Sequence, residues 1–259
     1  MKKVLTLAVV GALTLSGAAL ADEIATFSSA QQQEIGKLTE KWLTANPEIL
    51  IKMSQQLQQR QQQAQQSKFT DAVVKLSAQL QQVKGVPHAG PEDASVVVTE
   101  FFDYQCVFCH RDAPIVEKLM KDNPKVKFVF RDWPIFAAQY PLSNTAALTG
   151  IGVFREGGAD AYLKYHNGIF ATGHDEGKLT EQDIADVGAK STGKPLKLDD
   201  LKSYTATIDK NDILAKAVGA NGTPLFIVMP ADTDTPDKIT VLPRAASLDE
   251  LQAAINRAR

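Results

Sequence analysis

Two cysteines separated by two residues are the part of this chain whose residue types and spacing could do chemistry. Cys106-Val107-Phe108-Cys109 follows an extended segment, so we expect Cys106 at the start of a helix. Unpaired backbone N–H groups and the helix dipole stabilise an anion there, which lowers the pKa of a thiol. Cys109 lies one turn further along and is predicted to be more shielded. This spacing is typical of a dithiol in which Cys106 attacks and Cys109 resolves the mixed disulfide.

Three other uses of the same cysteines have to be weighed. A structural disulfide over so short a loop would restrict the unfolded chain by only about 2 kcal/mol. Two thiolates supply half of a zinc site and no histidine completes a recognised spacing, although two thiolates could hold Cu(I). Cys106 to His110 also fits the C-x-x-C-H pattern of haem attachment. The β-rich segment before the motif and the strand predicted after Thr223-Pro224 favour the dithiol over haem.

Composition places these cysteines in a soluble globular protein of one or two domains. The chain has 259 residues, a net charge of −2, 44% hydrophobic residues and 22% charged residues. Two cysteines exclude a disulfide-rich scaffold and an all-thiolate metal centre built from one chain. The balance of 28 basic and 30 acidic residues gives no electrostatic case for binding nucleic acid. We expect no cofactor and no resident metal.

The first residues indicate export. Residues 1–21 combine two lysines, an apolar stretch and a small-x-small end at Ala19-Leu20-Ala21, and so are predicted to be a cleaved signal peptide. No later apolar run reaches the length of a membrane span, so we expect none in the mature chain. The predicted location is the periplasm, an oxidising compartment in which thiol chemistry is used.

Residues 22–84 are predicted to form a helical oligomerisation segment. Asn46-Pro47-Glu48 is typical of a helix start with a capping amide, and no Gly or Pro follows before Gly85. Apolar residues recur at helical spacing along this segment, first at Leu50, Met53, Leu57 and Ala64, then at Phe69, Val73, Leu76, Leu80 and Val83. Such a stripe must be buried, and we expect the same helix of another subunit to cover it in a dimer or trimer. The alternative is packing against the chain's own domain.

Residues 85–92 are predicted to be a linker, and residues 93–259 the domain that carries the dithiol. The pattern predicts strands at 94–102, 126–133, 225–229 and 239–242, a helix that passes from Cys106 through Pro114, and a helical insertion at about 137–217. Ser247 and Glu250 form a capping-box pattern at the start of a final helix.

The segment Val98–Cys109, with Gly222-Thr223-Pro224 downstream and a helical block between them, resembles the DsbA-like branch of the thioredoxin superfamily. The helical N-terminal extension is similar to that of its oligomeric members, including the suppressor-of-copper-sensitivity protein C (ScsC) group. The resemblance implies an α/β thioredoxin fold with an inserted helical subdomain, preceded by the helical oligomerisation segment. The Val-Phe pair between the cysteines differs from the Pro-His pair of the best-known member, so strong oxidant behaviour is not implied.

The resemblance also implies roles for residues outside the motif. Pro224 corresponds to a cis-proline that faces the dithiol, which leaves the Thr223 backbone free to pair with an extended substrate. Glu100 falls where the superfamily keeps a buried acid beneath the resolving cysteine. Strand alternation points it inward, where a raised pKa would suit it to take the Cys109 proton. Independently of the resemblance, Phe108 within the motif and His110 next to it are candidate substrate contacts, because both lie beside the dithiol.

Two further pairs of residues receive a structural interpretation. Asp103 and Tyr104 are expected to shape the turn before the helix. Arg131 and Asp132 are expected to be a surface or capping pair.

Together these expectations describe a periplasmic thiol-disulfide oxidoreductase, a disulfide isomerase or oxidase that acts on exported proteins. Its Cys106–Cys109 pair would be reset by a membrane redox partner of the DsbB or DsbD type. The alternative of another class is a periplasmic copper-handling protein that binds Cu(I) through the same cysteines.

Overall fold

The computed structural model of the chain describes residues 27–195, 198–232 and 235–259, so the expected signal peptide lies outside the described residues. The chain divides into two compact units, one ending at Gln59 and one beginning at Arg60. The helices and strands follow in the order α1 (Ser29–Ala45), α2 (Glu48–Gln81), β1 (His88–Ala89), β2 (Val96–Phe102), α3 (Val107–Asp122), β3 (Lys127–Asp132), α4 (Leu142–Ala171), α5 (Glu181–Thr192), α6 (Thr205–Val218), β4 (Leu225–Pro230), β5 (Thr240–Leu242) and α7 (Leu248–Ala258), with 3-10 turns η1 (Leu198–Tyr204) and η2 (Pro236–Lys238).

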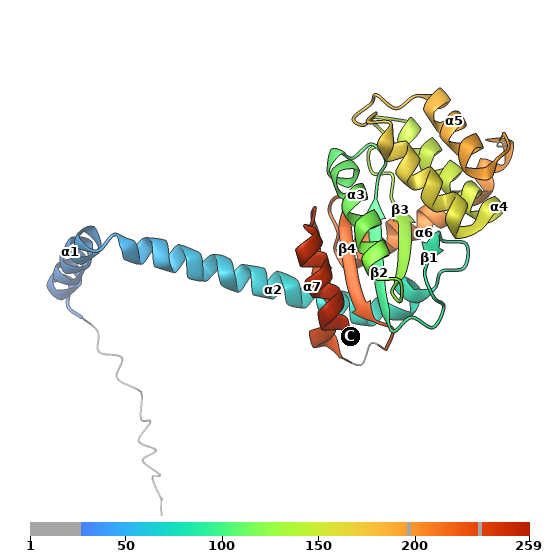
Figure 1. Ribbon diagram of the computed structural model, residues 1–259. Coiled ribbons are helices and arrows are strands. Elements are labelled where there is room, and N and C mark those ends of the chain that lie inside the picture. The colour runs from blue at the N-terminus through green and yellow to red at the C-terminus, as the bar shows by residue number, and fades with distance from the viewer. Residues whose placement is uncertain (1–26, 196–197, 233–234) are drawn as a thin grey trace, which may run out of the picture. The chain divides into compact units, whose positions relative to one another are not determined.

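A five-stranded mixed sheet with the order β1-β3-β2-β4-β5 lies at the centre of the second unit (Figure 1). Strands β2 and β3 are parallel and are joined through α3, while β4 pairs with β2 in the antiparallel direction. All seven residues of β2 are buried, as expected for a central strand covered on both faces. This is the thioredoxin fold that the sequence predicts.

The two faces of the sheet have separate cores. Alternate β2 residues Val98 and Phe102 face a core that contains side chains of α3, α4 and α7. Their neighbours Val97 and Phe101 face a second core, made with α6 and the C-terminal half of α2. The strong alternation in β2 therefore decides which residues lie beneath the helix that carries the cysteines.

The helical insertion consists mainly of α4, α5 and α6. Helix α4 changes direction at Gly158, whose backbone is non-helical at φ 71°, ψ −163°, a combination accessible to glycine. The capping boxes predicted at Ser247 and observed also at Thr180 open α7 and α5. Among the helices in the described ranges, none combines the length and the apolar character needed to cross a membrane.

The N-terminal unit contains α1 and the first part of α2. Helix α2 is a single helix of 34 residues, where the absence of Gly and Pro allows either one helix or two nearly continuous ones. The capping role predicted for Asn46 is wrong, because its side chain donates back to the Trp42 carbonyl oxygen and so ends α1. Helix α1 itself, which opens with a capping box at Ser28 and Gln31, was not predicted as a separate element.

The predicted boundaries after residue 84 and after residue 92 differ from those in the structure. Phe69, Val73 and Leu80 of α2 are buried in the core of the second unit, so this half of the stripe packs against the chain's own domain. Val86 is buried in the same core, and β1 pairs with β3, so residues 85–92 form part of the sheet domain and are not a linker. The first half of the stripe, at Leu50, Met53 and Leu57, is exposed.

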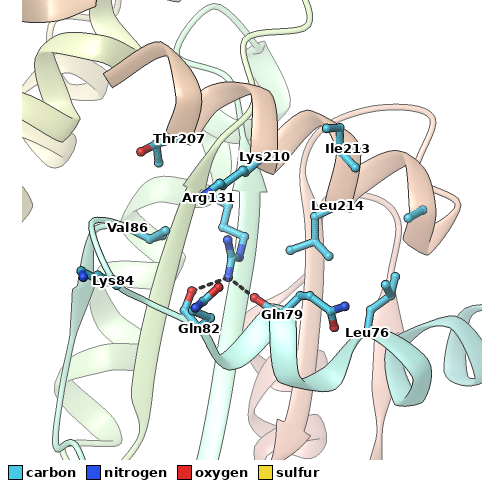
Figure 2. Close-up of a pocket in the computed structure, with 11 residues that line it drawn as sticks. Leu76, Gln79, Gln82, Lys84, Val86, Arg131, Thr207, Lys210, Ile213 and Leu214 are labelled. Carbon is cyan, nitrogen blue, oxygen red and sulfur yellow. Dashed lines mark hydrogen bonds between the residues drawn. The ribbon is translucent and has the colours of Figure 1, made fainter. Parts of the chain in front are cut away.

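The end of α2 is held by a buried arginine of β3. One guanidinium nitrogen of Arg131 donates to the backbone oxygens of Gln79, Leu80 and Gln82, at 3.1, 2.8 and 3.3 Å. Figure 2 shows the Arg131 side chain pointing toward this helix end. Arg131 is one of the residues that line a cavity of about 400 Å³ between α2 and α6. These contacts satisfy carbonyl groups that a helix leaves unpaired at its C-terminus.

Candidate functional site

The turn that presents the cysteines is fixed by Asp103. Its carboxylate accepts hydrogen bonds from the backbone N–H of Gln105 at 2.8 Å, the Ser143 hydroxyl at 2.7 Å and the backbone N–H of Phe136 at 2.9 Å. The Asp103 carbonyl oxygen accepts from the N–H of Cys106 at 3.0 Å. The expected turn-shaping role of Asp103 is therefore observed, and through Ser143 the helical insertion helps to position the turn.

Cys106 is the N-cap residue of α3, so the thiol lies at the helix N-terminus as predicted. Both cysteines are free thiols, and both are buried. The Cys106 Sγ lies 3.3 Å from the backbone oxygen of Thr223, and the Thr223–Pro224 peptide bond is cis, as the resemblance implies. Residues more than a hundred positions apart are thus brought together at one thiol.

The electrostatic environment lowers the pKa of Cys106 to about 6. The largest cause is a hydrogen bond with the Cys109 thiol. Burial opposes the shift, while Thr223 and the backbone N–H groups of Cys109 and Phe108 add to it. The sequence predicts a lowered pKa from the helix N-terminus. The structure adds that the neighbouring thiol is the larger contributor.

Cys109 has the opposite character. Its side chain is fully buried, and burial together with the hydrogen bond to Cys106 raises the pKa of Cys109 well above its usual value. Glu100 lies on β2 beneath this helix and is 3% exposed. Burial, followed by the charges of Asp112, Asp132 and Cys106, raises the pKa of Glu100 to about 8. The inward orientation predicted for Glu100 from strand alternation is thus observed.

Phe108 and His110 lie at the rim of the dithiol. Phe108 is 48% exposed, with the Arg111 guanidinium carbon 4.6 Å from its ring centre. His110 makes a 2.8 Å hydrogen bond through Nδ1 to Asp175 and stacks near Phe170. The site therefore brings Cys106, Cys109 and Thr223 into contact, while His110 interacts mainly with the helical insertion.

No group of three or more His, Cys, Asp or Glu side chains in the described ranges has the arrangement of a metal site. A metal held by this dithiol would therefore have two protein ligands from one chain.

Several polar residues are buried in the two cores although the sequence patterns do not predict it. Asp132 is 1% exposed and Arg131 is 2% exposed, so the expectation of a surface position is wrong, whereas the alternative of a capping role is observed for Arg131 at the end of α2. Adjacent strand residues point to opposite faces, so Asp132 faces the core that contains the cysteines, whereas Arg131 faces α2. His166 of α4 is also buried, in contact with aromatic rings of the first core. Alternation in β3, applied to Phe128, Phe130 and Asp132, could have predicted the inward position of Asp132.

Comparisons with known proteins agree with this site. The sequence model of the Thioredoxin family matches residues 82–246, and that of the copper resistance protein ScsC N-terminal domain matches residues 31–64. The chain is 30% identical over 190 residues to disulfide bond formation protein D of Bacillus subtilis, a match that covers 68% of this chain and 78% of that protein.

Solved structures show the same likeness over most of the chain. BcfH of Salmonella enterica Typhimurium superimposes with a TM-score of 0.77 at 35% identity, covering 88% of this chain and 96% of that one. Proteus mirabilis ScsC in a transitional conformation superimposes with a TM-score of 0.59 at 27% identity, covering 90% and 98%. With a thioredoxin fold, a C-x-x-C pair at the start of α3 and an ScsC-type N-terminal segment, the chain belongs to the thioredoxin family as a thiol-disulfide oxidoreductase of the DsbA-like, ScsC type.

Proposed function

We propose that this protein is a periplasmic disulfide isomerase, with some oxidase activity, in which Cys106 is the nucleophile and Cys109 the resolving cysteine. The observation that carries the proposal is the contrast between the two thiols. The pKa of Cys106 is lowered to about 6, whereas that of Cys109 is raised by burial. At neutral pH Cys106 is therefore largely a thiolate that can attack, whereas Cys109 stays protonated until the resolving step.

In the reductive half of this reaction, the Cys106 thiolate attacks a substrate disulfide. A bond forms between Cys106 Sγ and one substrate sulfur, and the other substrate sulfur leaves as a thiolate with the bonding electron pair. That thiolate can attack a different disulfide of the substrate and so free another substrate thiolate. This second thiolate attacks the substrate sulfur of the mixed disulfide, Cys106 leaves as a thiolate with the electron pair, and the substrate is isomerised. Alternatively, Cys109 loses its proton and attacks Cys106 Sγ, which reduces the substrate and forms the Cys106–Cys109 disulfide.

In this proposal the Thr223 backbone holds the substrate during the exchange. Its backbone oxygen is 3.3 Å from Cys106 Sγ, so an extended peptide that pairs with this backbone would bring its own sulfur to the nucleophile. Phe108, which is exposed beside the dithiol, would add an apolar contact to the substrate.

Self-association is proposed to favour isomerisation over oxidation, because several dithiols around a shared space could be shielded from a membrane oxidase. Support comes from large apolar side chains at helical spacing in the first unit that are exposed in the single chain, namely Ile35, Leu38, Trp42, Leu50, Met53 and Leu57. Helices with such a stripe are stabilised by burying it against a partner. We propose a dimer or trimer formed through residues 27–59.

Two variants test the role of the cysteines. Cys109→Ser is expected to accumulate covalent mixed disulfides between Cys106 and exported proteins, seen as thiol-sensitive bands on non-reducing gels. Cys106→Ser is expected to form none. The absence of trapped species in the Cys109→Ser variant would contradict the exchange mechanism.

The same variants test the alternative that the protein handles copper. This alternative is considered because the matching N-terminal domain is described as that of a copper resistance protein. A protein that binds Cu(I) through two thiolates would lose affinity in either variant and trap no substrate. Competition with a coloured Cu(I) chelator measures this directly. Tight Cu(I) binding by the wild type without mixed disulfides in Cys109→Ser would favour the copper function.

A further inference from the structure

A second buried carboxyl group lies on the strand next to Glu100. Strands β2 and β3 are parallel, with Glu100 opposite Phe130 and Phe102 opposite Asp132. Asp132 is therefore two residues beyond the position opposite Glu100, and it points to the same face of the sheet. The two side chains thus lie on one face of the sheet without a direct hydrogen bond, and the negative charge of Asp132 acts on Glu100.

Neither carboxyl group is paired with a hydrogen-bond donor or a positive charge in the part of the chain that the structure describes. Asp132 is 1% exposed, and neither of its carboxylate oxygens has a hydrogen-bond partner among the described residues. The buried Oε2 of Glu100 is also without a partner. No lysine, arginine or histidine in the described ranges forms an ion pair with either residue. Two carboxyl groups placed in this way are costly to ionise together.

The surrounding groups supply no positive charge. The His166 ring packs in a tilted arrangement against Phe130, with ring centres 4.9 Å apart, and burial lowers the pKa of His166 to about 3, so its ring is neutral. The titratable groups that face the two carboxyls from the neighbouring segments are Asp103, Tyr104, Cys106, Cys109, Asp112, Tyr162, Tyr165 and His166.

We propose that Asp132 and Glu100 form an electrostatically coupled carboxyl pair that carries one proton in total before the resolving step and takes up the proton of Cys109 during thiol exchange. Glu100 lies nearer the cysteines, since its charge acts on Cys109, and Asp132 acts through Glu100 as a positioning residue. This assignment rests on the proposed exchange function and adds a second acid to its proton chemistry.

The proton balance of the resolving step follows from this pair. The Cys109 S–H proton moves to the Glu100 carboxylate, so that the pair goes from one proton to two. The Cys109 thiolate then attacks Cys106 Sγ, the bond from Cys106 to the substrate sulfur breaks, and the substrate leaves as a thiolate with the electron pair. The substrate is reduced, the cysteine pair is oxidised, and the return of the proton accompanies the reverse step.

The coupling can be measured without any exchange activity. In the full chain, oxidised at Cys106–Cys109 and labelled with ¹³C at the Asp and Glu carboxyls, NMR titration should show two inflections for Glu100 and for Asp132. Asp132→Asn should leave one inflection at Glu100, and Glu100→Gln should leave one at Asp132. Single inflections in the wild type, unchanged by replacing the other residue, would overturn the proposal.

A kinetic measurement tests the use of the pair. A mixed disulfide of Cys106 with an aromatic thiol releases a coloured thiolate when Cys109 attacks, so stopped-flow absorbance follows the resolving step alone. Asp132→Asn should slow release about 10-fold or more at neutral pH and change its pH profile, because the proton acceptor is altered. Glu100→Gln combined with Asp132→Asn should be no slower than Glu100→Gln alone.

Asp122→Asn is the matched control, because it removes an exposed carboxyl group from α3, the helix that carries Cys109. It should leave both the rate and the pH profile unchanged. A lower melting temperature of Asp132→Asn with an unchanged pH profile would assign Asp132 a purely structural role and overturn the proposal. Coupled titration with unchanged release would overturn the proton-transfer step. If the wild type exchanges no disulfides with proteins, the proposed function fails while the NMR result still decides the coupling.

Discussion

Cys106 and Cys109 lie within one helical turn but differ in acidity because of their surroundings. Cys106 lies at the helix N-terminus. There the Cys109 thiol, the Thr223 side chain and backbone N–H groups stabilise the negative charge of its thiolate. Cys109 points into the core and loses solvent without gaining a comparable set of donors. The division of labour in the proposed reaction is thus a property of two residues and their immediate contacts.

The first prediction concerns this thiolate. Ultraviolet absorbance should follow the ionisation of Cys106 in the reduced protein with a midpoint near pH 6. Cys109→Ala should raise this midpoint, since it removes the largest stabilising contact, while Cys109→Ser should raise it less because a hydroxyl can still donate. A Cys109→Ala midpoint equal to that of the wild type would show that the helix N-terminus alone lowers the pKa.

The second prediction concerns His166, whose ring is buried among aromatic side chains and whose nitrogens have no partner among the described residues. Burial lowers its pKa from 6.5 to about 3, so the unfolded chain binds more protons than the folded one between these values. Stability should therefore fall as the pH falls from 6.5 to 3, by on the order of 4 kcal/mol from this group.

His166→Phe should reduce this acid dependence, measured as the free energy of unfolding by urea at several pH values. Parallel curves for the wild type and His166→Phe would contradict a neutral buried imidazole.

At the scale of elements, strand β3 connects two parts of the molecule because consecutive residues face opposite sides. Asp132 faces the core of the cysteines, whereas Arg131 reaches the last carbonyl groups of α2. The guanidinium is buried and has no carboxylate partner among the described residues, and burial lowers its pKa to about 10. Its charge is balanced by the negative end of the α2 dipole.

The third prediction follows from this contact. Arg131→Met should destabilise the protein by about 3 kcal/mol, because it leaves buried carbonyl groups of α2 without donors. Hydrogen exchange should also become faster at the C-terminal end of α2. Lys84→Met provides a matched control, since Lys84 lines the same cavity but is exposed, and it should have little effect on either measurement. Equal stability of the two variants would refute the role of Arg131.

At the scale of the whole molecule, the unit boundary lies inside α2, between Gln59 and Arg60. The part of the helix after this point contributes Phe69, Val73 and Leu80 to the core of the sheet domain. Each such side chain contributes about 2 kcal/mol on burial, so together they provide about 6 kcal/mol, a large share of the stability of an ordinary domain.

The fourth prediction uses this boundary. A chain that begins at Arg60 should stay folded, with a melting temperature close to that of the longer chain, and should be monomeric by light scattering. A chain that begins at Gly85 should be strongly destabilised, because core side chains lose their cover. If the chain beginning at Arg60 retained full activity on scrambled disulfides, self-association would not be needed for isomerisation.

The sequence was sufficient for those features that depend on local pattern. The C-x-x-C spacing, the β2 alternation that buries Glu100, the capping box at Ser247 and the uninterrupted helix of α2 are all local, and the structure contains each of them. Resemblance supplied Pro224, which lies far from the cysteines in the chain.

Only the tertiary structure decided which groups cover the apolar face of α2 and the two faces of β3. An apolar stripe on a helix indicates burial but does not identify the partner, so Phe69 and Leu50 look alike in the sequence although one is buried by its own domain and the other is exposed. The same applies to Arg131 and Asp132, because the cost of burying a charge depends on groups that the fold brings from elsewhere. Local periodicity sets which way a side chain points, and packing decides what it meets.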